Sequence, residues 1–197
     1  MKAISGIIGA IIIGAIIIVI VGHINTVPTL DESSKASWSQ VQNQYQRRAD
    51  LIPNLVATVK GYASHEKEVL TQVTQARAQV GQMSITPAVL NDPKAFANFE
   101  KAQGELSSAL SRLMMVSERY PELKADKNFM ALQVQLEGTE NRISVARRDY
   151  IQTVQAYNLE LRTVPGRWVA AIFYPDATVK ETFTAAPQSQ KAPNVSF

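Results

Sequence analysis

The sequence has no cysteine, only two histidines and almost no excess of either charge, with 20 lysines and arginines against 17 acidic residues. Without cysteine, the 197-residue chain forms no disulfide, and neither side of a membrane is excluded on redox grounds. The net charge of +3 suits solubility and is not the basic stripe of a nucleic-acid-binding protein. We therefore predict no nucleic-acid partner.

The motifs of common catalytic sites are also missing. His65-Glu66 begins like the zinc motif HExxH, but Val69 stands where the second histidine belongs. His23 lies in or beside an apolar run, so a multi-histidine metal site or a Ser-His-Asp triad lacks its parts. The motifs G-x-S-x-G, GxxxxGK[ST] and G-x-G-x-x-G do not occur. The sequence thus predicts a protein that is not an enzyme and has neither cofactor nor metal.

Aliphatic residues, in contrast, are concentrated near the start of the chain. Ile4 to Ile24 is a run of about twenty-one uncharged residues, the length of a helix that spans a bilayer. The alternative is a cleaved signal peptide, whose apolar region is usually only about 7 to 15 residues long. Val21 to Asn25 also offers no convincing small-x-small cleavage site. We predict that residues 1–25 form a transmembrane anchor in the lipid bilayer.

Small residues share one face of this anchor. Such a face lets two helix backbones approach closely in lipid, although Gly and Ala are common in membrane helices in any case. The residues of this predicted packing face are Gly6, Ala10, Gly14 and Gly22.

Charges on the two flanks bear on the orientation of the anchor. Lys2 precedes the span, whereas Asp31 and Glu32 follow it before the next cation. This asymmetry favours the short end inside the cytoplasm and the following domain outside it.

Three apolar seams follow. Counting in steps of three and four from Trp38 to Met83 meets apolar residues at nearly every step, which indicates one amphipathic helix about 70 Å long. Pro53 lies inside it, so the helix either kinks or divides there, and the unbroken phase favours the kink. Similar seams cover 92–120 and 126–163, each opened by an aspartate that can cap a helix. The predicted fold is all-α, an elongated up-down antiparallel bundle of three long helices.

Shorter segments connect and complete this bundle. Residues 26–34 form a predicted linker in which Pro28 breaks the helix, and residues 35–175 form the bundle domain. Within it, Arg167 to Tyr174 (RWVAAIFY) either closes one bundle end as a helical turn, which we favour, or lies against a membrane or a neighbouring subunit. Residues 176–197 are predicted to be a C-terminal extension, disordered from about 185.

Charged residues interrupt the seams and are the candidate contacts. Arg48 and Glu66 are about 27 Å apart along one helix, so they cannot pair with each other. Each either extends its charged end to the surface, pairs with another helix or subunit to fix register, or belongs to a ligand site. The predicted register or subunit contacts are Arg47, Arg48, Asp50, Glu66, Glu137, Glu140, Arg142 and Arg147.

Several of these motifs resemble the LemA protein family. The run from Tyr45 to Val56 contains the specific core RRADLIPNLV, and the later tracts YPELK and LEGTENRI resemble the second half of the family. The resemblance covers nearly the whole soluble part. It implies a bacterial cytoplasmic-membrane protein with one N-terminal span and an antiparallel helical bundle, and it implies no established catalytic residue.

Together these features predict a membrane-anchored scaffold of the bacterial cell envelope that forms homo-oligomers through its transmembrane and bundle helices. One alternative is an adaptor or regulatory partner of another membrane protein, such as a protease or sensor, with the C-terminal tail as its docking peptide. Another is a lipid-binding bundle that remodels membranes.

Overall fold

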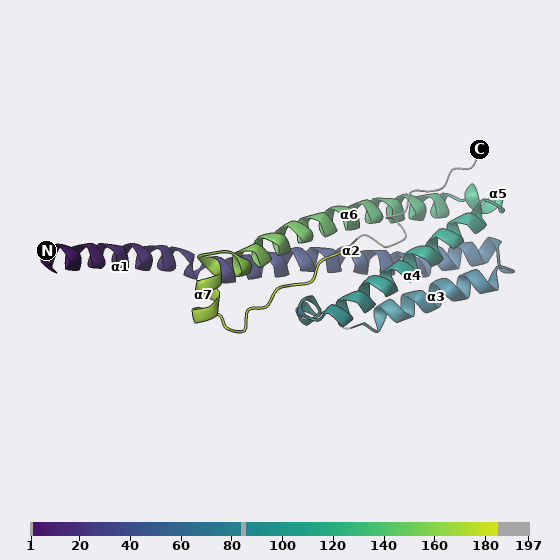
Figure 1. Ribbon diagram of the computed structural model, residues 1–197. Coiled ribbons are helices and arrows are strands. Elements are labelled where there is room, and N and C mark those ends of the chain that lie inside the picture. Colours follow the sequence, from purple (N-terminus) through teal and green to yellow (C-terminus); the bar gives the residue numbers. More distant parts are fainter. Residues whose placement is uncertain (1, 84–85, 185–197) are drawn as a thin grey trace, which may run out of the picture.

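The computed structural model describes residues 2–83 and 86–184, and all the regular elements in these ranges are helical. Two helices of 37 and 36 residues, α2 and α6, run side by side along the molecule, and the shorter α3 and α4 pack beside the half of them farther from the N-terminus (Figure 1). The predicted all-α antiparallel bundle is confirmed. The elements are α1 (Lys2–Ile24), α2 (Thr26–Tyr62), α3 (Lys67–Gly81), the 3-10 helix η1 (Pro87–Asn91), α4 (Pro93–Ser117), α5 (Pro121–Lys124), α6 (Lys127–Arg162) and α7 (Gly166–Phe173).

Helix α1 projects from the end of the bundle and leads almost directly into α2 (Figure 1). A single turn residue, Asn25, separates the two helices. Helix α1 supplies the apolar start of the helical run Ile13–Tyr62, which is long and apolar enough to cross a membrane and is the one such run in the described part of the chain. Large side chains of α1, including Ile11 and Ile18, are exposed in the single chain, as expected of a surface that faces lipid.

The predicted linker over 26–34 is wrong, because these residues belong to α2. Pro28 lies in the first turn of that helix, where its missing N–H has no intrahelical partner to lose. Ser34, within this range, is buried inside α2 and donates from its hydroxyl to the carbonyl of Asp31.

The single helix predicted from Trp38 to Met83 is also wrong, since the chain reverses between Tyr62 and Lys67. Gly61 has the lowest helix propensity of the residues near the break, and a turn here lets α3 pack back on α4. The apolar phase continued across the break because each half has its own buried face. The bundle therefore has four principal helices rather than three.

Helix α2 continues through Pro53 without dividing there, which is the alternative that we favoured. Pro53 lies on the exposed side of the helix. A proline at this position leaves the carbonyl of Ala49 without its usual partner four residues later. Arg77 of α3 supplies the missing donor, with its Nε 3.0 Å from that oxygen. The proline thus creates an acceptor that pins α3 against α2.

An aromatic cluster forms the centre of the core. The Trp38 ring is fully buried. Its centroid lies 5.2–6.1 Å from the centroids of four other rings, those of Phe96, Phe99, Tyr150 and Phe183. Aromatic contacts at such distances add to the free energy of burial. The cluster joins α2, α4 and α6 to Phe183 of the C-terminal segment.

Both predicted aspartate caps are confirmed. Asp92 accepts hydrogen bonds from the backbone N–H groups of Lys94 and Ala95 at the start of α4. Asp126 accepts from the N–H of Phe129 at the start of α6. These caps satisfy donors that a helix N-terminus otherwise leaves without partners.

The turn between α6 and α7 depends on a close approach at Gly166. A Cβ atom placed there would collide with the backbone carbonyl and the carboxyl group of Glu160. At Gly104, in contrast, a Cβ would meet nothing within 4 Å, although that residue is also helical.

We predict opposite effects for alanine at these two glycines. Gly166→Ala should lower the free energy of unfolding by about 1–3 kcal/mol because the turn must open. Gly104→Ala should raise it by about 0.5–1 kcal/mol, since alanine is the better helix former. Chemical denaturation of the detergent-solubilised full chain measures both. Equal effects of the two changes would contradict the close contact at Gly166.

Candidate functional site

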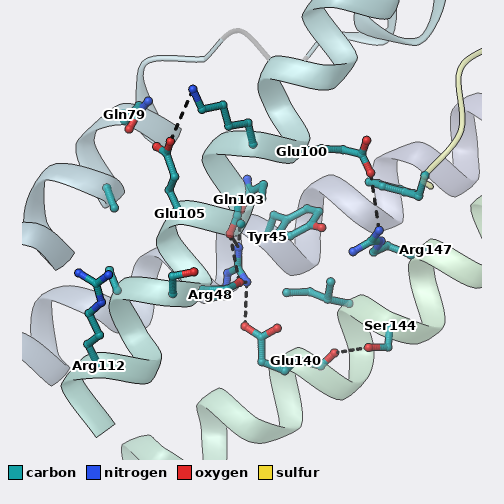
Figure 2. A pocket seen from close by; sticks show the side chains of 18 of the residues that line it. Tyr45, Arg48, Gln79, Glu100, Gln103, Glu105, Arg112, Glu140, Ser144 and Arg147 are labelled. Atoms are coloured by element: carbon teal, nitrogen blue, oxygen red, sulfur yellow. Dashed lines mark hydrogen bonds and ion pairs between the residues drawn. The ribbon is translucent and has the colours of Figure 1, made fainter. Parts of the chain in front are cut away.

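Arg48 of α2 is the most deeply buried charged residue in the described part of the chain, with 1% of its surface exposed. Its guanidinium lies between α4 and α6, where Nη1 donates to Glu140 Oε1 at 2.9 Å and to Ser107 Oγ at 2.8 Å (Figure 2). Nη2 donates to the side-chain carbonyl of Gln103. The same group lies 5.0 Å from the centre of the Tyr45 ring. One side chain therefore links three helices.

A polar cleft of about 1230 Å³ opens around this arginine, between α2, α3, α4 and α6. Burial raises the pKa of Glu100 on its wall, and it outweighs the opposing effects of the Thr184 N–H and of Arg147, whose Nη2 is 3.8 Å away. Arg48 Nε and Gln103 Nε2 are buried without a partner. No group of three or more His, Asp or Glu side chains in the described ranges is placed to hold a metal ion.

The structure brings some of the predicted contacts together. Arg48 and Glu140, two of the predicted register or subunit contacts, form an ion pair, so Arg48 does not extend its charge to the surface. Arg147 borders the same cleft and stacks 4.1 Å from the Phe183 ring centre. Arg142 donates from α6 to Gln44 of α2 at 3.2 Å.

Other predicted contacts lie apart from this cluster. Glu66 is at the far end of the bundle, where it pairs with Arg119 at 3.1 Å. Arg47, Asp50 and Glu137 are exposed, and the last two accept hydrogen bonds from glutamines on their own helices.

The predicted small-residue face of α1 is only partly described. Gly6 and Ala10 belong to α1, but their exposure and contacts are outside what the structure describes. At Gly14 and Gly22 an added Cβ would meet no atom within 4 Å. This part of the face is unpartnered in the single chain.

Sequence reasoning missed a second buried cation, Lys180, in the extended segment that follows α7. Its Nζ lies 2.5 Å from Asp31 Oδ1, donates to Ser34 Oγ and sits 4.5 Å from the centre of the Tyr157 ring. Burial alone would raise the pKa of Asp31, but hydrogen bonds from Lys180 and Lys35 outweigh it and hold that pKa below its ordinary value. We call Lys180, Asp31 and Ser34 the latch.

Backbone hydrogen bonds hold the rest of this segment on the bundle. The amide of Asn158 both donates to the Lys180 carbonyl and accepts from the Lys180 N–H, at 2.9 and 2.8 Å. Tyr150 Oη donates to the carbonyl of Glu181 at 2.7 Å, and Phe183 joins the aromatic cluster. Phe183 in a polar stretch was the one available sign that residues 176–184 pack. The predicted disorder from about 185 lies outside the described residues.

Fold and site together define a membrane-associated helical-bundle protein with one candidate membrane helix in its described part. The LemA family model matches residues 37–197. The chain belongs to the LemA family, and the resemblance seen in the sequence is confirmed.

Three relatives illustrate the range of the family. Magnetosome protein MamQ 2 of Paramagnetospirillum magneticum is 26% identical over 75% of this chain and 60% of its own length. Magnetosome protein MamQ of Magnetospirillum gryphiswaldense is 24% identical over the same shares. Protein LemA of Metamycoplasma hominis is 22% identical over 77% of this chain and 65% of its own length. The match thus spans less than two thirds of each of these proteins.

Removing the acid that pairs with Arg48 should destabilise the bundle. We predict that Glu140→Ala lowers the free energy of unfolding by about 1–2 kcal/mol, because it leaves a buried guanidinium with fewer partners. Glu137→Ala on the same helix should change it by less than about 0.5 kcal/mol. Denaturant titration of the full chain in detergent compares the two. A loss from Glu137→Ala as large as that from Glu140→Ala would contradict the assignment.

The latch should make stability depend on pH. Because the pKa of Asp31 is lower in the folded state, its contribution is complete above the unfolded value of about 3.8 and is lost as the pH falls through the folded value. We predict that Asp31→Asn costs about 1–2 kcal/mol at pH 7 and that its difference from the wild type vanishes in acid. In a Lys180→Met background this dependence should shrink. A difference that stays constant with pH would count against the latch.

Proposed function

We propose that this protein is a membrane-anchored, self-associating helical scaffold, in which α1 holds the chain in the bilayer and the outer face of α6 contacts a second copy. One observation carries the proposal: large apolar side chains lie on the outer face of α6, one of the two long bundle helices, and the single chain leaves them uncovered.

Most of these side chains share one face of the helix. At about 100° per residue, four of the five exposed large apolar residues of α6 fall within a sector of about 60° and extend along about 43 Å of helix, whereas Ile151 lies outside this sector. Val134 and Leu159 are 68% and 57% exposed. Isolated exposed apolar residues are ordinary on a soluble surface, but a row along one helix is typical of a contact surface. We call this row the α6 stripe, and its members are Met130, Val134, Val145 and Leu159.

The surroundings of the α6 stripe suit a helix from another chain. A groove of about 400 Å³ lies between α2 and α6 and includes Val145 in its lining. Helices pack by placing the side-chain ridges of one into the grooves of the other. Polar residues such as Asn141 and Arg148 interrupt the stripe, which suits an interface between soluble chains rather than one with lipid.

The membrane helix supports the same proposal. Its open face at Gly14 and Gly22 allows close approach of a second α1 within lipid. An association that uses both α1 and α6 gains from two linked contacts, because the first raises the effective concentration for the second. Two of the relatives are named as magnetosome proteins, and the proposal extends to this chain only the general theme of organisation at a membrane.

The α6 stripe gives the test. We predict that Val134→Glu combined with Val145→Glu weakens self-association of the full chain in nanodiscs or detergent at least tenfold, since charges would enter an apolar contact. Met115→Glu, at an exposed apolar position on α4, should leave it unchanged. Mass photometry over a concentration series measures the assembly.

Two results would contradict the scaffold proposal. One is a wild-type chain that stays monomeric at every concentration. The other is co-purification of one unrelated protein in stoichiometric amount, which the adaptor alternative predicts.

A further inference from the structure

Helix α7 is apolar on both of its faces. On one face Ala170 packs with Val27 and Tyr157 at the bundle end, and Val169 is fully buried. The other carries Trp168 and Ile172, which are 58% and 65% exposed. Arg167 is the one charged residue of α7, and the bundle covers only one of the two apolar faces. Exposed large apolar side chains grouped on the other face are typical of a contact surface.

The position of α7 identifies what lies on its other side. The helix packs against the end of α1, and Tyr174, the residue after α7, donates from its hydroxyl to the carbonyl of Ile24 at 2.9 Å. Ile24 is the last residue of α1. The C-terminal end of α7 is thus fixed at the level where the apolar run ends, which is the level of the lipid headgroups.

The direction of α7 fits the same surface. Figure 1 shows α7 lying crosswise to α1 and α2 at the junction between them. If α1 crosses the bilayer, a helix crosswise to it lies in the plane of the membrane. Amphipathic helices that bind membranes lie in this way, with aromatic side chains at the boundary between headgroups and acyl chains.

Charges around α7 are compatible with headgroups. Arg162 and Arg167 are exposed on either side of its start, whereas Asp176 is exposed beyond its end. Glu160 already has a hydrogen-bond partner, since its Oε1 lies 3.1 Å from His23 Nδ1. The exposed arginines can reach lipid phosphates while the aromatic and aliphatic residues enter the apolar layer.

We propose that α7 is a membrane-interface helix whose exposed face, formed by Trp168, Ile172 and Phe173, is covered by the bilayer that α1 crosses. This contact is a second attachment to lipid. With α1 it fixes the tilt of the bundle relative to the membrane, and it does not depend on self-association.

The two tryptophans of the chain provide a direct test. Trp38 is fully buried and lies fourteen residues beyond Ile24, about 21 Å along the helix. Trp168 is the exposed one, so Trp168→Phe removes the reporter at a position where the core is not disturbed. The full chain is reconstituted singly in nanodiscs of phosphatidylcholine with brominated or unmodified acyl chains, and tryptophan emission is compared.

The proposal predicts at least a twofold loss of Trp168 emission in brominated lipid, taken as the difference between wild type and Trp168→Phe. The Trp38 emission that remains in Trp168→Phe should be the same in both lipids. Ile172→Glu should reduce the quenching severalfold, whereas Val145→Glu on α6 should not alter it.

Equal Trp168 emission in the two lipids, together with quenching by aqueous iodide, would overturn the proposal. Protection of Trp168 from both bromine and iodide would also overturn it, because a second protein surface would then be the occupant.

Discussion

The structure depends first on the burial of the Arg48 guanidinium. A charge removed from water destabilises the fold unless it is paired and hydrogen-bonded, so α2 is stable only where the acceptors of Ser107, Gln103 and Glu140 all reach it. These acceptors belong to α4 and α6, and sliding either helix by one turn would remove them. Apolar seams alone tolerate such slips, because one aliphatic side chain replaces another with little change. The polar contacts therefore select one register, and the aromatic rings around Trp38 pack only in that register.

The same rigidity extends toward the membrane. A single residue separates α1 from α2. The latch, through the ion pair of Lys180 with Asp31, holds the C-terminal segment against the first turns of α2. Burying a second cation there requires Asp31 to stay ionised, which is consistent with its lowered pKa. Together, α7 and the latch hold the C-terminal segment against the start of α2, at the end of the bundle that adjoins α1. The proposed scaffold thus presents its outer α6 face in a fixed relation to the anchor rather than on a flexible stalk.

Much of this fold follows from local sequence signals, whereas the site depends on relations between helices. Asp92 and Asp126 act within their own turns, and so the sequence reveals them as caps. The turn after Tyr62 was hidden, because the apolar phase of α2 continues into α3 by coincidence of spacing. Arg48 and Glu140 were each recognisable as charges on a seam, but their pairing needs the relative position of α2 and α6. Lys180 was missed because a lysine in a polar segment has no periodicity that reports burial.

The most direct test of this account is the coupling free energy between Arg48 and Glu140. A double-mutant cycle with Arg48→Met, Glu140→Gln and the double variant isolates it from the other effects of each change. The account predicts a favourable coupling of at least about 1 kcal/mol in the unfolding of the full chain in detergent, since one partner is buried and hydrogen-bonded. Effects that add to within about 0.3 kcal/mol would show that the two helices take their register from apolar packing alone.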